Sequence, residues 1–281
     1  MADAGVDLAR ECALWALPAD HTCAGVARRL LRQALERMGL PEELVHDATV
    51  AVNELAANVY RHVLTRPRSS RTATRPGPPE LWLYRRGRHE HSQLVCKVFD
   101  PLREPVARPA TRSGPLTDLP EHGRGLSIVE SLTAAWGWHL TRSRFGGRWS
   151  APGKAVWFAI PLPHHTSHPP PACTPLQAAR ALRAKLAARG IPATLHPGWN
   201  HSTLSIAAAL TVHCHDDTFT WTTNGTPARY AFSDLTEAAE QLVRIHEETT
   251  SLAHQPATEA CDRPAKTSGT ERADSHSSFG Y

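Results

Sequence analysis

Three polar side chains with possible chemical roles are spaced four residues apart: Glu54, Asn58 and His62. On a helix this spacing places them on one face, stacked over two turns. An amide oxygen and a carboxylate one turn apart suit a hard cation such as Mg²⁺, which takes few protein ligands together with phosphate and water. The carboxylate could instead activate a hydroxyl group or a water molecule beside that site. By spacing alone, however, a solvated or hydrogen-bonded helix face is the more frequent arrangement.

Two features further along the chain could act with this face. Gly123-Arg124-Gly125 follows a long stretch without periodicity and precedes an apolar helix, where glycines let backbone N–H groups approach an anion. Asp100 ends a predicted strand, and a carboxylate there can accept a hydrogen bond from an exocyclic amine such as that of adenine. Taken singly, each has a simpler explanation: an ordinary helix entry, and the turn chemistry of an Asp-Pro pair.

The first half of the chain contains the elements that must position these residues. Helical periodicity predicts a second helix from Pro41 to about Leu64, whose apolar stripe lies one position from Glu54, Asn58 and His62. Apolar spacing, alternation and breaker residues predict the other elements. These are an edge strand at 12–17, a helix at 24–38, strands at 81–85 and 93–99, a helix at 126–134, and strands at 136–140 and 155–160.

The second half begins with a proline-rich break and reads as a separate small module. Helices are predicted at 176–189 and 235–247, with strand-like runs at 193–196, 203–213 and 219–223, an Asn224-Gly225 turn and a possible fourth run at 228–232. We therefore expect an α-β-β-β-α module. From residue 249 onward the composition is polar, which predicts disorder. The expected division of the chain is 1–163, a linker at 164–175, the module at 176–248 and a tail at 249–281.

Composition excludes several classes of protein. The 281 residues include 31 basic and 27 acidic side chains, a net charge of only +4, so direct binding of nucleic acid is not expected. No run approaches the roughly 20 apolar residues that span a bilayer, and the N-terminus lacks the apolar segment of a signal peptide. The six cysteines are widely spaced without a C-x-x-C pair. We expect a reduced, cytoplasmic protein without a membrane partner.

The order of the motifs adds a family resemblance over about residues 10–163. Residues 50–62 resemble the N-box of the Bergerat-fold, histidine-kinase-like ATPases. Residues 98–101 resemble the strand of the first glycine box, 121–129 the second glycine box, and 153–161 the closing strand. The short spacing looks like the anti-sigma-factor serine/threonine kinase branch, particularly its actinobacterial regulators.

The resemblance implies an α+β fold, a two-layer α/β sandwich in which helices back a mixed four- or five-stranded sheet. ATP would lie between the N-box helix and a mobile lid. By position, Asn58 would bind Mg²⁺, Glu54 would be the general base and Asp100 would read the adenine amine. The phosphates would contact Gly123, Arg124 and Gly125, while His62 would orient its neighbours. Lys154 is close enough to the pocket in such folds to be considered, although a solvated strand-end lysine is favoured.

One departure from the family pattern concerns the first glycine box. Asp100 is followed by Pro101, and no glycine occurs before Gly114, so the rim of the adenine pocket is expected to be stiffer than usual. That pattern puts nucleotide affinity and turnover in question, and it leaves two classes of function open.

The leading hypothesis is an ATP-dependent serine/threonine kinase that phosphorylates an anti-sigma-factor antagonist and can also sequester a sigma factor. By resemblance it would form homodimers. The alternative is a non-catalytic, nucleotide-responsive protein-binding module. A sensor histidine kinase fragment is disfavoured because only ~23 residues precede the first predicted helix, with no visible phosphoacceptor helix among them.

Overall fold

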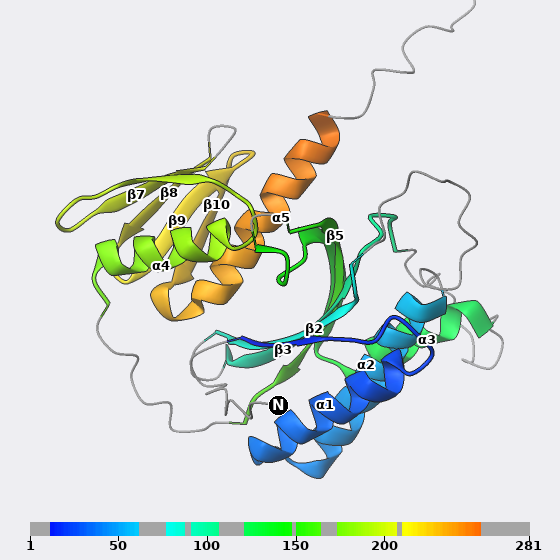
Figure 1. Ribbon diagram of the computed structural model, residues 1–281. Helices are drawn as coiled ribbons and strands as arrows, with labels where there is room; N and C mark the ends of the chain where they lie inside the picture. The colour runs from blue at the N-terminus through cyan, green and yellow to red at the C-terminus, as the bar shows by residue number, and fades with distance from the viewer. Residues whose placement is uncertain are drawn as a thin grey trace, which may run out of the picture.

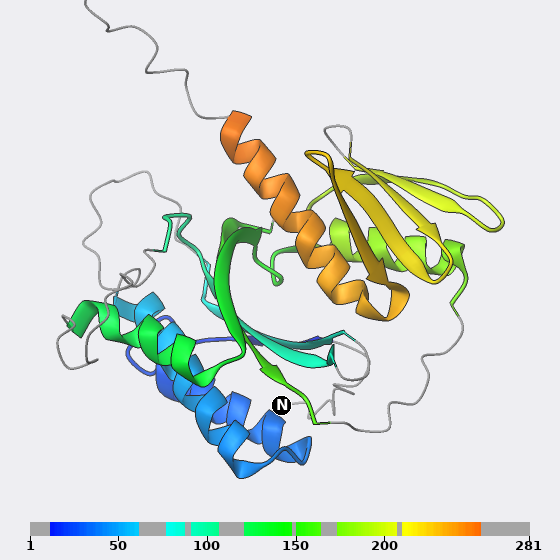
Figure 2. The ribbon, with the colours of Figure 1, turned by 180° about the vertical axis from the view of Figure 1, so that it is seen from behind.

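The computed structural model describes residues 12–61, 77–87, 91–106, 121–147, 150–163, 173–206 and 210–253, with only the backbone described at 121–124. Two α/β units pack together, and helix α5 of the second unit lies on the sheet of the first (Figures 1 and 2). The first unit contains β1 (Ala13–Ala16), α1 (Cys23–Arg37), α2 (Glu42–Val59), β2 (Glu80–Arg86), β3 (Gln93–Asp100), α3 (Glu121–Leu132), β4 (Ala135–Arg142) and β5 (Pro152–Pro161).

The first unit is built on a five-stranded sheet in the order β1-β2-β3-β5-β4. Every strand pair in it is antiparallel, so the expectation of a mixed sheet was wrong. β1 lies at the end of this strand order, beside β2, which confirms the predicted edge strand. Alternate residues along the strands face opposite ways. One face packs on α1, α2 and α3 around a core that includes Leu81, Cys96, Val98 and Phe158.

Local signals explain where the first two helices begin and end. Helix α1 ends before Gly39, whose φ of 68° lies in the left-handed region. Pro41 precedes α2, and Glu42 and Glu43 in its first turn suit the positive end of the helix dipole. The described helical backbone reaches residue 61, so the predicted continuation to Leu64 falls on residues outside the described part.

Helix α3 begins earlier than predicted. The glycine-rich segment was expected to be a loop that opens a helix at Leu126, whereas the structure places Gly123, Arg124 and Gly125 inside a helix that begins at Glu121. A glycine costs only about 1 kcal/mol in a helix relative to alanine, so packing can override it. Val129 is fully buried in the core, and this contact places α3 against α2.

The second unit has more strands than predicted. It comprises α4 (Pro175–Ala187), β6 (Ala193–His196), β7 (Ser202–Ile206), β8 (Leu210–His215), β9 (Thr218–Thr223), β10 (Thr226–Ala231), a 3₁₀ turn (Phe232–Asp234) and α5 (Leu235–Ala253). The five strands form an antiparallel meander. The run 203–213 was predicted as one strand but forms parts of β7 and β8, which pair with each other. The module is therefore α-β-β-β-β-β-α.

Two tight turns shape this meander. Asn224 and Gly225 both have positive φ and join β9 to β10, which confirms the predicted turn. Asp216 and Asp217 also have positive φ and join β8 to β9. The second turn was not predicted because it contains no glycine, although aspartate is among the residues that tolerate this conformation.

Helix α5 covers the face of the first sheet opposite α1, α2 and α3 (Figures 1 and 2). Aromatic residues of that face are buried, among them Trp82, Tyr84 and Phe99. The first unit is thus a two-layer sandwich that gains a third layer from the module. The helix extends to Ala253, so the expected disordered tail from residue 249 was wrong for its first five residues. Across the described ranges, no helix has both the length and the apolar content needed to span a membrane.

Candidate nucleotide site

The N-terminal part of α3 lies directly on the polar face of α2. A Cβ atom added to Gly125 would lie 2.8 Å from Glu54 Oε2 and 3.7 Å from Asn58 Nδ2. A separation below 3.0 Å requires something to move, so any larger residue at position 125 would press on the carboxylate. The structure therefore brings together three of the residues that the sequence singled out.

Glu54 and Asn58 occupy the partly exposed face of α2, next to its buried stripe. Both side chains are intermediate in exposure, whereas Leu55 and Val59 are buried in the core. Asn53 Nδ2 lies 3.4 Å from Glu54 Oε1 and donates a weak hydrogen bond to it. The polar groups are thus accessible to a ligand. His62 lies outside the described residues. The side chains at positions 122 and 124, on either side of Gly123, are not described either.

Asp100, the predicted adenine-reading residue, is the last residue of β3 and is only 4% exposed. Its Oδ1 atom accepts a hydrogen bond of 2.8 Å from the backbone N–H of Leu102, and its Oδ2 atom lies 2.6 Å from Lys154 Nζ. Burial raises the pKa of the Asp100 carboxyl above its ordinary value, although the ammonium group of Lys154 opposes that shift. Both carboxylate oxygens of Asp100 are therefore already in contact with a donor of the protein.

Lys154 is not the solvated strand-end lysine that the sequence favoured. It is 7% exposed and lies opposite Asp100 in the register of β3 and β5. Its ammonium group also donates to the Leu102 carbonyl at 3.1 Å. Gly153 permits this arrangement, because a Cβ there would lie 2.4 Å from the Asp100 carbonyl oxygen. The end of β5 therefore forms part of the surroundings of Asp100.

The C-terminal module contacts the turn that follows Asp100, a feature that the sequence analysis missed. Arg103 Nη1 pairs with Glu247 Oε2 of α5, and Arg103 Nη2 donates to the Glu247 carbonyl at 3.3 Å. Arg142, at the end of β4, donates to Glu247 Oε1 at 3.0 Å. The spacing of Glu237, Glu240 and Glu247 on one helix face was a signal that could have indicated an acidic stripe.

The middle of that acidic stripe lies in a buried ionic network between the two units. Glu240 is 2% exposed, and its Oε1 atom lies 2.6 Å from Arg189 Nη1, while its Oε2 atom lies 3.4 Å from Lys97 Nζ. Arg144 is a third cation near it. These cations hold the pKa of the Glu240 carboxyl well below its ordinary value despite burial. Arg189 also lies over the ring of Trp82, 4.7 Å from its centroid.

Glu237, at the N-terminal end of the same stripe, contacts a tyrosine and an arginine of the first sheet. Tyr84 donates a hydrogen bond of 2.6 Å to Glu237 Oε2, and Arg86 lies 3.5 Å from Glu237 Oε1. The Gly87 N–H donates to Asp234 at 3.0 Å. Together these contacts hold α5 against the sheet along most of its length, so the two units are joined by a polar interface with few exposed groups.

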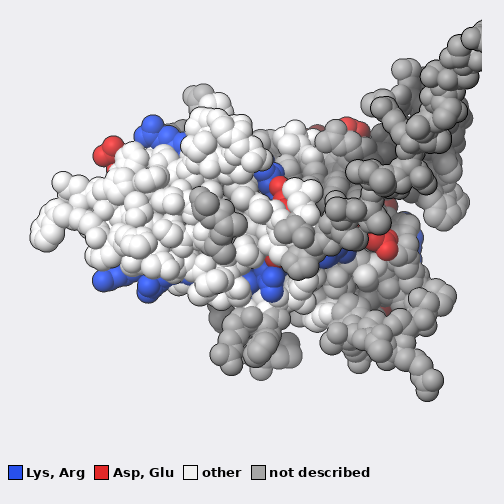
Figure 3. Space-filling model, turned by 90° about the horizontal axis from the view of Figure 1, so that it is seen from above, with Lys and Arg blue, Asp and Glu red and all other residues white. Residues whose placement is uncertain are grey.

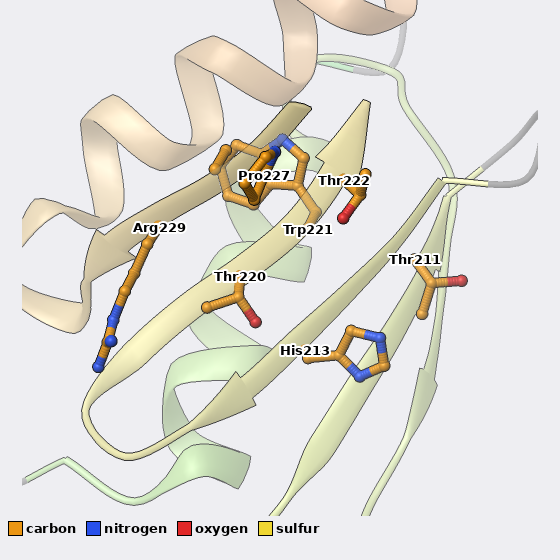
Figure 4. Close-up of a pocket in the computed structure, with 8 residues that line it drawn as sticks. Thr211, His213, Thr220, Trp221, Thr222, Pro227 and Arg229 are labelled. Carbon is orange, nitrogen blue, oxygen red and sulfur yellow. The ribbon is translucent and has the colours of Figure 1, made fainter. Parts of the chain in front are cut away.

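A hollow lies on the module, on the face of its sheet that points away from α4 and α5. Its volume is about 440 Å³, and His213, Thr220 and Thr222 project into it while Arg229 extends along one side (Figure 4). Seen from above, the described surface over this unit is mostly uncharged (Figure 3). No cluster of three or more potential metal ligands occurs among the described residues. Arg229 is the one charged residue among those that line the hollow, and His213 is the one residue there that could become charged.

In the N-terminal unit, helices back an antiparallel sheet, and the polar face of α2 lies against the glycine-containing α3. Residues 17–146 match the family model described as histidine kinase-like ATPase domain. Over those residues the N-terminal unit is thus similar to domains of that type. A search of curated proteins found no match.

Proposed function

We propose that this protein is an ATP-binding regulator of the anti-sigma-factor serine/threonine kinase type. The observation that carries the proposal is the approach of Gly125 to Glu54 and Asn58, which brings the second glycine box onto the N-box face. Neither motif is specific alone, but their contact across two helices is what a phosphate-binding site requires. The family match supports nucleotide binding, and the finer assignment rests on the motif spacing.

The residues present fit Mg²⁺ bound with ATP. The amide oxygen of Asn58 is an oxygen donor of the kind that Mg²⁺ takes, and the side chain is partly exposed. When bound, the ion would neutralise charge on the phosphates. Backbone N–H groups at Gly123–Gly125, near the positive end of α3, would stabilise the same charge.

Glu54 would act on the acceptor hydroxyl of a protein substrate. Its carboxylate would take the proton of a serine or threonine while the hydroxyl oxygen forms a bond to the γ-phosphorus and the bond to the ADP oxygen breaks. We propose an anti-sigma-factor antagonist as the phosphate acceptor, with a sigma factor as a further binding partner and a homodimer as the assembly.

A second candidate is a non-catalytic, nucleotide-responsive binding module. It is favoured by the Asp100–Lys154 ion pair, because that pair occupies part of the base-reading carboxylate. The polar interface with α5 favours it too, since such an interface can respond to a ligand. The two candidates differ in whether γ-phosphoryl transfer occurs.

The test compares Asn58→Ala and Glu54→Ala in the full chain, with His46→Ala as a control on an exposed position of the same helix. Calorimetry with Mg-ATP measures binding, and transfer of labelled γ-phosphate to a purified antagonist domain measures catalysis. Asn58→Ala is expected to abolish binding, whereas Glu54→Ala keeps binding and loses transfer. Unchanged affinity in Asn58→Ala would refute the metal assignment. Saturable binding without transfer by the unaltered protein would favour the second candidate.

A further inference from the structure

The turn after β3 is held by hydrogen bonds between Leu102 and the side chains of Asp100 and Lys154. Asp100 accepts from the Leu102 N–H, and Lys154 donates to the Leu102 carbonyl, so both backbone polar groups of Leu102 are bonded to the ion pair. The next residue is Arg103, which reaches α5. A displacement of Arg103 therefore acts on the same turn that holds the Asp100 carboxylate.

Glu247 is positioned to control that turn from the other unit. Its side chain is 3% exposed and binds two cations: Arg103 on the turn after β3, and Arg142 at the end of β4. Arg142 also donates to the Ser150 carbonyl at 2.6 Å, in the segment that leads into β5. Register pairs Arg142 with Pro152, two residues before Lys154. One carboxylate thus joins the two chain segments that flank Asp100 and Lys154.

We propose that Glu247 is a positioning residue for the nucleotide pocket, so that docking of α5 and binding of ATP are thermodynamically linked. This inference rests on the proposed function, in which Asp100 reads the base. Glu247 holds Arg103 and the segment around Arg142 in one arrangement, and through them it fixes the turn that bonds to the Asp100–Lys154 pair. The C-terminal module is then the part of the chain through which nucleotide occupancy is communicated.

The linkage has a physical basis in the burial of Glu247. An ion pair in water contributes little, but a carboxylate that is almost fully buried between two guanidinium groups is strongly coupled to both. A change in the position of Arg103 on ligand binding must therefore alter the contacts of α5. Coupling of this kind is reciprocal, so loss of the α5 contact must alter ligand affinity by the same factor.

The experiment uses the full chain and measures the dissociation constant of Mg-ATP by calorimetry. Glu247→Gln keeps the size of the side chain and removes its charge, whereas Glu248→Gln changes the neighbouring residue, which pairs with Arg244 within α5. Glu247→Gln is expected to weaken ATP binding about fivefold or more, the usual lower range of coupling between sites. Glu248→Gln is expected to bind as the unaltered protein does.

A double-mutant cycle tests whether Glu247 acts on ATP affinity through its contact with Arg103. Arg103→Gln removes the same contact from a side chain that is 32% exposed, and it serves as the test if Glu247→Gln fails to fold. The effects of Arg103→Gln and Glu247→Gln on ATP affinity are expected to be non-additive. Hydrogen exchange should also show that ATP increases protection in the last turns of α5.

The outcomes distinguish the inference from the proposed function. If the unaltered protein binds Mg-ATP and both Arg103→Gln and folded Glu247→Gln bind it equally well, the positioning role is wrong and the proposed function stands. Additive losses in the double variant would also overturn it. If the unaltered protein does not bind Mg-ATP at all, the proposed function fails and the inference fails with it.

Discussion

Asp100 and Lys154 face each other across β3 and β5, with Oδ2 and Nζ separated by 2.6 Å and both residues almost fully buried. A buried pair of this kind stabilises a fold less by its attraction than by the penalty that follows when one partner is lost. The pair also lies where the base of a nucleotide is expected. Its energetics can therefore be measured separately from any ligand.

Lys154→Met is predicted to destabilise the protein by about 3 kcal/mol, because the Asp100 carboxylate is left buried without a counter-ion. Asp100→Asn combined with Lys154→Met should recover most of that loss, since no buried charge remains. Urea unfolding of the two single variants and the double variant provides the measurement. Equal stability of Lys154→Met and the double variant would contradict the prediction.

Gly125→Ala is predicted to leave the fold intact and to weaken Mg-ATP binding, because the new methyl group would lie 3.7 Å from Asn58 Nδ2, in the space where the phosphates are expected. Gly25→Ala is the matched control, since it also lies inside a helix and a Cβ there would meet nothing within 4 Å. The control should gain roughly 0.5–1 kcal/mol of stability without a change in affinity. Thermal unfolding and calorimetry measure the two quantities, and tight ATP binding by Gly125→Ala would count against the site.

Glu240→Gln is predicted to cost about 3–5 kcal/mol, because Lys97, Arg144 and Arg189 would share a buried site without their common anion. Glu248→Gln alters a half-exposed residue on the same helix and should change the free energy of unfolding by less than about 0.5 kcal/mol. Limited proteolysis between the two units offers an independent measurement. Similar stability of both variants would show that the network does not hold the units together.

The buried imidazole of His139 predicts a loss of stability in mild acid. Its Nε2 atom lies 3.1 Å from Lys97 Nζ and its Nδ1 atom lies 2.9 Å from the Leu140 carbonyl oxygen, which fits a neutral ring that accepts from the lysine. Burial, with the nearby Lys97 charge, lowers the pKa of His139 to about 3. The unfolded chain takes up a proton near pH 6.5 while the folded protein does not, so acidification favours unfolding.

Stability should therefore fall as the pH drops from about 6.5 to 5, by up to ~1.4 kcal/mol per unit for this one group. His139→Gln keeps an acceptor and a donor but does not titrate, so its stability should change less over that interval. The comparison is made above pH 5 because the lowered pKa values of Glu237 and Glu240 cause a separate loss below their ordinary value of 4.5. Identical pH profiles for both proteins would refute the assignment of a neutral His139.

Most of the secondary structure could be predicted from the sequence, because helical and strand periodicity depend on residues a few positions apart. The prediction failed where long-range packing decided the outcome. Gly123 and Gly125 favour a loop locally, yet α3 continues through them because its apolar residues are buried against the core. In the module, continuous apolar residues from β7 to β8 made these two strands look like one.

By itself the sequence determined the helix face that carries Glu54 and Asn58, since a spacing of four residues leaves little freedom in where the side chains point. Only the tertiary structure decided that Gly125 lies on that face, that Lys154 neutralises Asp100, and that Glu247 reaches Arg103 from the C-terminal module. Those contacts join residues distant in the chain, and they depend on strand register and on which sheet face α5 covers. Periodicity within a single element carries no information about either.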